Sequence, residues 1–222
     1  MKILSYNINR STQEKINKIL QFNADVYILP EIACPSKVKI PEGYEMDWMG
    51  NYDFKGLGVI RKSEMKADIP QWYNPSHQYF LPIIIENKLI MAAWPTRSDE
   101  NAPKDYPQIA MEALHEYAPY LKEFPSVISG DMNCYKGQAG ETKRYSIENL
   151  FRFLGDMGFV SVYHQRSGEL IGKESRATYY HRFNENSPFF LYYTFSNMAI
   201  KLYALCEWDK EISDHVAQMI EL

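Results

Sequence analysis

The stretch ISGDMNCYKG, from Ile128 to Gly137, brings an acid and an amide to the end of an apolar run. Val127 and Ile128 are strand-forming residues, and Gly130 ends the apolar run. Asp131 and Asn133 follow within three residues of that glycine. A buried strand that ends in this way places its polar side chains at the rim of a sheet, where functional sites are commonly built. We therefore expect a site around Asp131 and Asn133.

Three other predicted strand ends carry polar residues of the same kind. An opening strand over residues 1–8 has Asn7 near its end, and a second strand, over residues 24–31, ends at Glu31. The last strand of the chain begins after Ser213, Asp214 and His215. Each of these positions taken singly fits an ordinary turn or a solvated strand end. Their occurrence together, at four strand ends, favours one shared site.

Carboxylate and amide oxygens suit a hard divalent cation such as Mg²⁺ better than they suit zinc. Mg²⁺ is commonly held by one or two carboxylates together with the phosphate oxygens of a substrate. An imidazole such as that of His215 can bind a phosphate oxygen or move a proton. The residue types therefore indicate phosphoryl chemistry assisted by a metal.

Strands outnumber helices in the predicted secondary structure. Apolar periodicity, capping residues and turn residues predict helices over 11–23, 106–124 and 146–159, and strands over 1–8, 24–31, 55–60, 79–86, 88–94 and 126–133. Ser11 and Glu14 have the spacing of a capping box at the start of the first helix. The region after residue 160 is predicted to consist mostly of short strands, so two β-sheets flanked by helices is the expected architecture.

Composition narrows the class of protein. The chain has 222 residues, of which 45% are apolar, so we expect a single domain spanning residues 1–222. The formal net charge is −4, which counts modestly against a long polyanionic substrate. The three cysteines form no CxxC pair, which argues against a disulfide scaffold and indicates a reducing compartment. No apolar run approaches the ~20 residues of a membrane span, and we expect a cytoplasmic monomer.

The ordered motifs resemble those of the endonuclease/exonuclease/phosphatase superfamily, the group of DNase I and exonuclease III. The matching stretches are SYNI (5–8), PE (30–31), GDMN (130–133) and SDH (213–215), and they span nearly the whole chain. KGLGV (55–59) and WYNPSHQYFLPI (72–83) are similar to a small bacterial branch of it. The resemblance implies a four-layered α/β sandwich of two packed, mainly antiparallel sheets flanked by helices. It also implies hydrolysis of a phosphate ester with Mg²⁺ or Mn²⁺ as cofactor.

The resemblance also assigns the metal ligands. It implies that Glu31 is the principal ligand, with Asn7 and Asp214 close to the same ion.

The catalytic roles are implied in the same way. Asp131 would position or deprotonate the attacking water, and Asn133 would hold that water or a phosphate oxygen. His215 would bind the phosphate and stabilise its developing charge, and Asn7 would assist. An acid and an amide stand together because water and phosphate must be held together for in-line attack.

Two positions depart from the superfamily pattern. In FFLYYTFSN (189–197), Tyr192 stands where an acid that orients the final histidine is expected. A neutral phenol cannot stabilise an imidazolium as a carboxylate does, so either another acid, such as Asp209, has that role or activity is reduced. Trp94 stands where many members have a histidine, and stacking on substrate is one role for it. His164 and Arg182 are further candidates for substrate binding.

Three functions remain open at this point. A nuclease that hydrolyses the phosphodiester bonds of DNA or RNA comes first, because the metal and water residues are all present. A phosphatase or phosphodiesterase for small molecules suits the acidic chain. A non-catalytic binding protein on the same fold is supported by Tyr192 alone. We expect a nucleic acid or phosphate-ester substrate and no contact with membranes.

Overall fold

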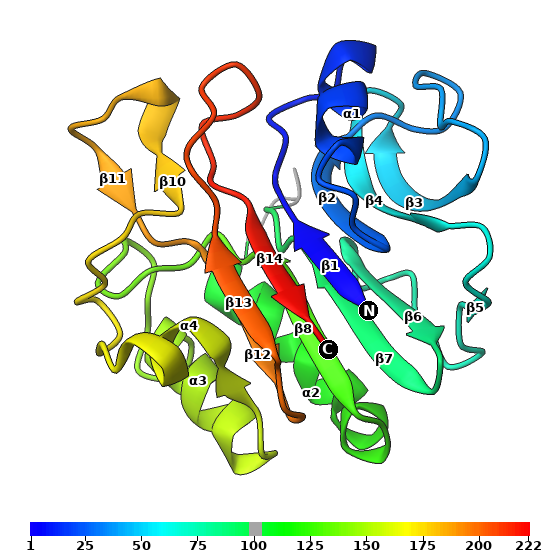
Figure 1. Ribbon diagram of the computed structural model, residues 1–222. Helices are drawn as coiled ribbons and strands as arrows, with labels where there is room; N and C mark the ends of the chain where they lie inside the picture. The colour runs from blue at the N-terminus through cyan, green and yellow to red at the C-terminus, as the bar shows by residue number, and fades with distance from the viewer. Residues whose placement is uncertain (98–103) are drawn as a thin grey trace.

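The computed structural model describes residues 1–97 and 104–222. Two six-stranded sheets pack face to face, and helices lie on their outer faces (Figure 1). Most neighbouring strands are antiparallel, and only the pairs β1–β2 and β7–β8 are parallel among the described residues. The expected sandwich of two mainly antiparallel sheets flanked by helices is confirmed.

The strands of each sheet come from distant parts of the chain. In spatial order, the first sheet consists of β13 (Leu202–Leu205), β14 (Gln218–Glu221), β1 (Lys2–Ser5), β2 (Val26–Ile32), β4 (Lys55–Lys62) and β3 (Tyr44–Tyr52). The second consists of β5 (Ala67–Asp68), β6 (Phe80–Ile85), β7 (Lys88–Ala93), β8 (Ser126–Asp131), β12 (Tyr192–Ser196) and β9 (Val160–Ser161). A separate two-stranded ribbon joins β10 (Tyr179–Tyr180) to β11 (Pro188–Phe189).

Helices cover the outer face of each sheet. They are α1 (Gln13–Leu20), α2 (Tyr106–Glu123), α3 (Ile147–Asp156) and α4 (Val162–Ser167), whereas a 3₁₀ turn, η1 (His181–Phe183), lies exposed between β10 and β11. Among the described residues no helix is both long and apolar enough to cross a bilayer.

Strand β2 shows how the layers are held together. Successive side chains of a strand point to opposite faces, and here Val26 and Ile28 pack between the two sheets. Tyr27 and Leu29 pack on the other face, in the cluster that includes Ile16 of α1. Because both faces are buried, the strand reads as a continuous apolar run rather than as an alternating one.

A polar seam, that is, a row of hydrogen-bonded polar side chains, lies between the two sheets. Ser5 of β1 donates a hydrogen bond of 3.2 Å to the hydroxyl of Tyr192 on β12. The side-chain amide of Gln218 on β14 donates to the backbone carbonyl of Tyr192, and its oxygen accepts from Thr194. Tyr192 is paired in register with Asp131, so the seam lies next to the predicted site.

The first helix begins later than predicted. Thr12, not Ser11, caps α1, and its side chain accepts the backbone N–H of Lys15. The hydroxyl of Ser11 instead accepts the N–H of Ala33, a residue that follows β2. A tertiary hydrogen bond has therefore displaced the local capping box.

The region after residue 160 consists mostly of short strands, as predicted, but it also contains a helix. Val162–Ser167 forms the helix α4, which ends at Gly168 in the left-handed conformation. A helix of six residues is too short to show a clear apolar period, so its residues carry no helix signal. The strand Tyr44–Tyr52 was also missed, because most of its residues are only half-buried.

Candidate active site

Glu31 lies on a bulge near the end of β2. Pro30 pairs with Leu57 and Ile32 with Gly56, which leaves Glu31 as the extra residue of the bulged strand. Its φ of 66° is in the left-handed region, which costs a non-glycine residue roughly 1–2 kcal/mol. Bulges commonly redirect a side chain at the rim of a sheet, and this one lies where the sequence predicted a metal ligand.

Asp131 and Asn133 lie where β8 ends, as predicted. Gly130 has a φ of 152°, and a Cβ there would lie 1.8 Å from the carbonyl oxygen of Ala93 on β7, so only glycine fits. The backbone N–H of Asn133 donates to Asp131 Oδ1 at 3.1 Å. Its side-chain amide donates to the carbonyl of Pro95 at 3.0 Å, so the Asn133 side chain is held by the loop after β7.

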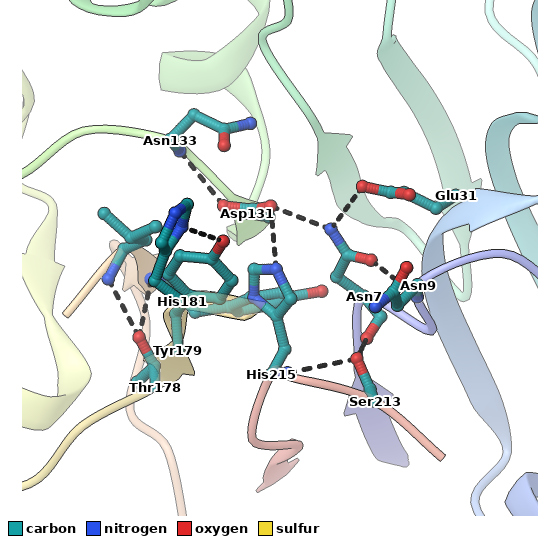
Figure 2. A network of polar contacts seen from close by, with 12 residues as sticks. Asn7, Asn9, Glu31, Asp131, Asn133, Thr178, Tyr179, His181, Ser213 and His215 are labelled. Carbon is teal, nitrogen blue, oxygen red and sulfur yellow. Dashed lines mark hydrogen bonds and ion pairs between the residues drawn. The ribbon is translucent and has the colours of Figure 1, made fainter. Parts of the chain in front are cut away.

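Asn7 links the two predicted carboxylates (Figure 2). Its side-chain nitrogen donates to Asp131 Oδ2 at 2.9 Å and to Glu31 Oε1 at 3.3 Å. Its oxygen accepts the backbone N–H of Asn9 at 3.0 Å. In this arrangement the amide nitrogen of Asn7 faces the two carboxylates. Its oxygen could bind a metal beside Glu31 only after the amide group rotated by about half a turn.

His215 completes the cluster from the other end of the chain. Ser213 donates to the backbone carbonyl of Asn7 at 2.7 Å and accepts the backbone N–H of His215 at 3.0 Å. The imidazole Nε2 lies 3.7 Å from Asp131 Oδ2, which is longer than a hydrogen bond. The Nδ1 atom is buried and has no hydrogen-bond partner among the described residues.

Burial sets the charges of this cluster. It raises the pKa of Asp131 to about 6, against the opposing hydrogen bonds from Asn7 and Asn133. It lowers the pKa of His215 to about 4. At neutral pH, Asp131 is therefore largely ionised and His215 is neutral.

The two predicted carboxylate ligands fit a hard cation. Burial raises the pKa of Asp214, and the negative charge of Glu31 raises it further, so the two carboxylates repel each other. A divalent ion would relieve that repulsion, and Mg²⁺ needs only one or two protein carboxylates. Within residues 1–97 and 104–222, no three His, Cys, Asp or Glu side chains form a group that could hold a metal by themselves. The donor set thus fits Mg²⁺ with substrate oxygens rather than an all-protein metal cage.

Lys55 was missed by the sequence reasoning. Its ammonium lies 3.5 Å from Glu31 Oε2 and 4.9 Å from the ring centroid of Trp94. Trp94 is buried and packs edge-on against Tyr79, with ring centroids 4.7 Å apart. Lys55 thus lies between Glu31 and Trp94, the residue predicted to bind substrate. Lys55 is the first residue of the motif KGLGV, but nothing in that motif indicated its contact with Glu31.

His164 and Arg182 lie outside the hydrogen-bonded cluster. His164 is on α4, where Nδ1 is bonded to Ser161 at 2.8 Å and Nε2 to Glu174 at 3.1 Å. These bonds connect α4 to the end of β9 and to the loop that follows the helix. Arg182 lies exposed on η1, within the β10–β11 ribbon, with a φ of 53°.

The departure at Tyr192 is visible in the structure. Tyr192 is fully buried and its hydroxyl accepts from Ser5, so it offers no charge to His215. Asp209 is not hydrogen-bonded to His215; its carboxylate accepts the backbone N–H of Glu211, and Nδ1 of His215 has no partner among the described residues. The residue next to the imidazole is instead Tyr179, with ring centroids 4.5 Å apart. The run TYYHRF gave an aromatic signal there but no indication of this contact.

Solved structures of other proteins share this architecture. An AP endonuclease from Archaeoglobus fulgidus matches with a TM-score of 0.69 at 15% identity, over 99% of this chain and 98% of that one. The 3′ phosphatase NExo from Neisseria, bound to a product DNA hairpin, matches with a TM-score of 0.65 at 15% identity, over 100% and 98%. The endonuclease domain of TRAS1, a telomere-specific non-LTR retrotransposon, matches with a TM-score of 0.67 at 11% identity, over 100% and 97%.

The chain has the endonuclease/exonuclease/phosphatase fold. At 11–15% identity these likenesses concern the fold alone. No protein-family model matches the chain, and no curated protein sequence matches it either. Within this fold, the cluster of Asn7, Glu31, Asp131 and His215 is assembled from both sheets at one rim.

Proposed function

We propose that the chain is a divalent-metal-dependent phosphodiesterase that hydrolyses nucleic acid. The observation that carries this proposal is the buried Asp131 carboxylate, held by Asn7 and by the backbone of Asn133, with the His215 imidazole facing it. A carboxylate with a pKa raised by burial to about 6 is a competent acceptor for the proton of a water molecule near neutral pH.

Glu31 and Asp214 are the residues we assign to Mg²⁺ or Mn²⁺. When bound, the ion supplies positive charge that stabilises the phosphate oxygens during the displacement. Asn7 holds Glu31 and Asp131 at a fixed separation, and its oxygen joins the ligand set only if the amide turns over.

The remaining residues act on water and phosphate. Asp131 orients the attacking water and accepts its proton. Asn133 and the neutral imidazole of His215 donate hydrogen bonds to phosphate oxygens, on which negative charge develops. Lys55 adds a positive charge next to Glu31, and its ammonium lies over the ring of Trp94. The fold neighbours, an AP endonuclease and a 3′ phosphatase bound to DNA, add support for nucleic acid as the substrate.

A phosphatase or phosphodiesterase acting on small molecules is the second candidate. The observation in its favour is the formal net charge of −4, which gives little bulk attraction for a polyanion. The reaction residues would be the same, since both reactions need an oriented water and a stabilised phosphate.

One experiment separates these functions. Purified protein and a matched Glu31→Ala variant are incubated in Mg²⁺ and in Mn²⁺ with single-stranded DNA, duplex DNA, RNA and a generic phosphodiester. Cleavage of a nucleic acid by the wild type alone supports the nuclease and identifies its substrate class. Cleavage of the generic ester alone supports the second candidate. Absence of cleavage in every arm contradicts both candidates and favours a binding protein.

A further inference from the structure

Among the described residues, no acid is hydrogen-bonded to the imidazole of His215. Its Nδ1 atom has no hydrogen-bond partner in the described part of the chain, and its Nε2 atom is 3.7 Å from Asp131. The hydroxyl at position 192 is bonded to Ser5, and the Asp209 carboxylate is bonded to a backbone N–H. A side chain that lacks directional hydrogen bonds needs another contact to keep one orientation.

The β10–β11 ribbon fixes the backbone on both sides of His215. Tyr179 and His215 form an antiparallel β-bridge. The N–H of Tyr180 donates to the carbonyl of Asp214 at 2.7 Å, and the N–H of Val216 donates to the carbonyl of Thr178 at 2.9 Å. The loop that carries His215 is therefore paired to the ribbon as part of a small sheet.

The same bridge brings the ring of Tyr179 onto the imidazole (Figure 2). The ring centroids are 4.5 Å apart and the planes are inclined by 33°. The His215 side chain is only 6% exposed. A tilted ring contact at this distance restricts the imidazole to one orientation through shape rather than through charge.

The Tyr179 ring is itself held in place. Its hydroxyl is bonded to Nδ1 of His181 at 2.9 Å. The backbone N–H of His181 donates to the carbonyl of Ser187, across the ribbon. Phe189 on β11 adds a second ring contact, at 6.2 Å between centroids.

We propose that Tyr179 is the positioning residue for His215, in place of the acid that is absent at position 192. The proposal rests on the proposed function, because it concerns how His215 meets the phosphate. Contact with the Tyr179 ring keeps Nε2 on the side of Asp131 and leaves Nδ1 without a competing partner. His215 thus acts as a hydrogen-bond donor whose direction is set by packing against Tyr179.

The kinetic test compares Tyr179→Leu with Tyr179→Phe. Leucine removes the ring, so we expect kcat to fall by about tenfold to a hundredfold with little change in KM. Phenylalanine keeps the ring and loses only the hydroxyl, so kcat should stay within about threefold of wild type. This change is much smaller than the loss expected when a reacting group is misplaced. An unchanged kcat in Tyr179→Leu contradicts the proposal, and so does an equal loss in both variants, which would assign the effect to the hydroxyl.

A double variant separates positioning from loss of fold. In the His215→Ala background, Tyr179→Leu should cause no further decrease in kcat, because the two residues act as one unit. A further decrease of the same size as in the wild-type background contradicts the proposal.

An NMR measurement tests the contact without relying on activity. The chain has only five histidines, so the His215 ring signals can be identified by their loss in His215→Gln. We expect a ring-current shift on these signals that Tyr179→Phe preserves and Tyr179→Leu removes. Signals that are the same in all three proteins overturn the proposal. If wild type and Glu31→Ala hydrolyse the same substrates, the proposed function fails. The NMR result then still shows whether Tyr179 is in contact with His215.

Discussion

Asn7 and Asp131 are joined by a hydrogen bond of 2.9 Å that connects the end of β1 in one sheet to the end of β8 in the other. The two residues are 124 positions apart in the chain. The amide of Asn7 is one of the two hydrogen-bond donors that favour the ionised form of this buried carboxylate. The ionisation of Asp131, on which its proposed role as a proton acceptor rests, therefore depends on how the two sheets are packed.

Replacing Asn7 by alanine should lower kcat by about a hundredfold, the usual cost of losing one oriented donor in a buried site. The pKa of Asp131 should also rise, because a group that lowers it is lost. Steady-state kinetics and the pH profile of kcat measure both effects. Asn17→Ala, on the exposed face of α1, is the matched control and should leave both unchanged. An Asn7→Ala enzyme with wild-type kcat would contradict the linking role.

Asp131→Asn should abolish activity and stabilise the fold at alkaline pH. Since burial raises the Asp131 pKa from 3.8 to about 6, the folded state binds this proton more tightly than the unfolded state does. The cost of the ionised group is absent below pH 3.8, grows between the two pKa values and is complete above pH 6. About two pKa units correspond to at most ~3 kcal/mol. Thermal unfolding in chelator should give a higher Tm for Asp131→Asn than for wild type at pH 8, and no such advantage at pH 4. An equal difference at both values would contradict the buried charge.

Gly130→Ala should destabilise the protein and damage the site together. The added Cβ would lie 1.8 Å from the carbonyl oxygen of Ala93, and the φ of 152° is strained for any other residue. We expect a loss of about 3 kcal/mol in the free energy of unfolding, measured by denaturant titration. The control is Gly155→Ala on α3, where a Cβ meets no atom within 4 Å. Alanine there should be neutral or slightly stabilising, because it is the better helix former. Equal effects of the two substitutions would show that the close approach of β7 and β8 is not what requires glycine at position 130.

Asp209→Ala should leave kcat unchanged. Its carboxylate accepts a backbone N–H within its own loop and is not bonded to His215. The local bond is worth about 1 kcal/mol, so a modest drop in Tm is the only effect we expect. Loss of activity in Asp209→Ala with an intact fold would show that Asp209 had taken the role of the acid absent at position 192.

The sequence predicted where those residues of the candidate site that lie at strand ends are placed in the fold. Glu31, Asp131 and the Ser213–His215 motif could be found because each follows or precedes a run of strand-forming residues. The sequence could not predict which atoms of these residues meet. The left-handed conformation of Glu31 depends on how β2 pairs with β4, and the direction of the Asn7 amide depends on Asp131 in the other sheet.

Residues brought in by tertiary pairing carried no such signal. Lys55 is the first residue of β4, and nothing in its sequence context distinguishes it from other lysines. Only the pairing of β2 with β4 places its ammonium near Glu31. Tyr179 stands in a run of aromatics and reaches His215 through an isolated β-bridge. Ser11 matched a capping box, but its hydroxyl is bonded to Ala33, so here a local rule gave the wrong helix start.

We propose that this cluster hydrolyses phosphodiesters with a divalent ion. The most direct measurement is single-turnover cleavage of an oligonucleotide in Mg²⁺, in chelator, and after Mg²⁺ is restored, with wild type, Glu31→Ala and Asp131→Asn prepared identically. We predict cleavage by wild type in Mg²⁺, none in chelator, recovery when Mg²⁺ returns, and no cleavage by either variant under any condition. Cleavage that survives the chelator, or that Glu31→Ala carries out as fast as wild type, would contradict the account.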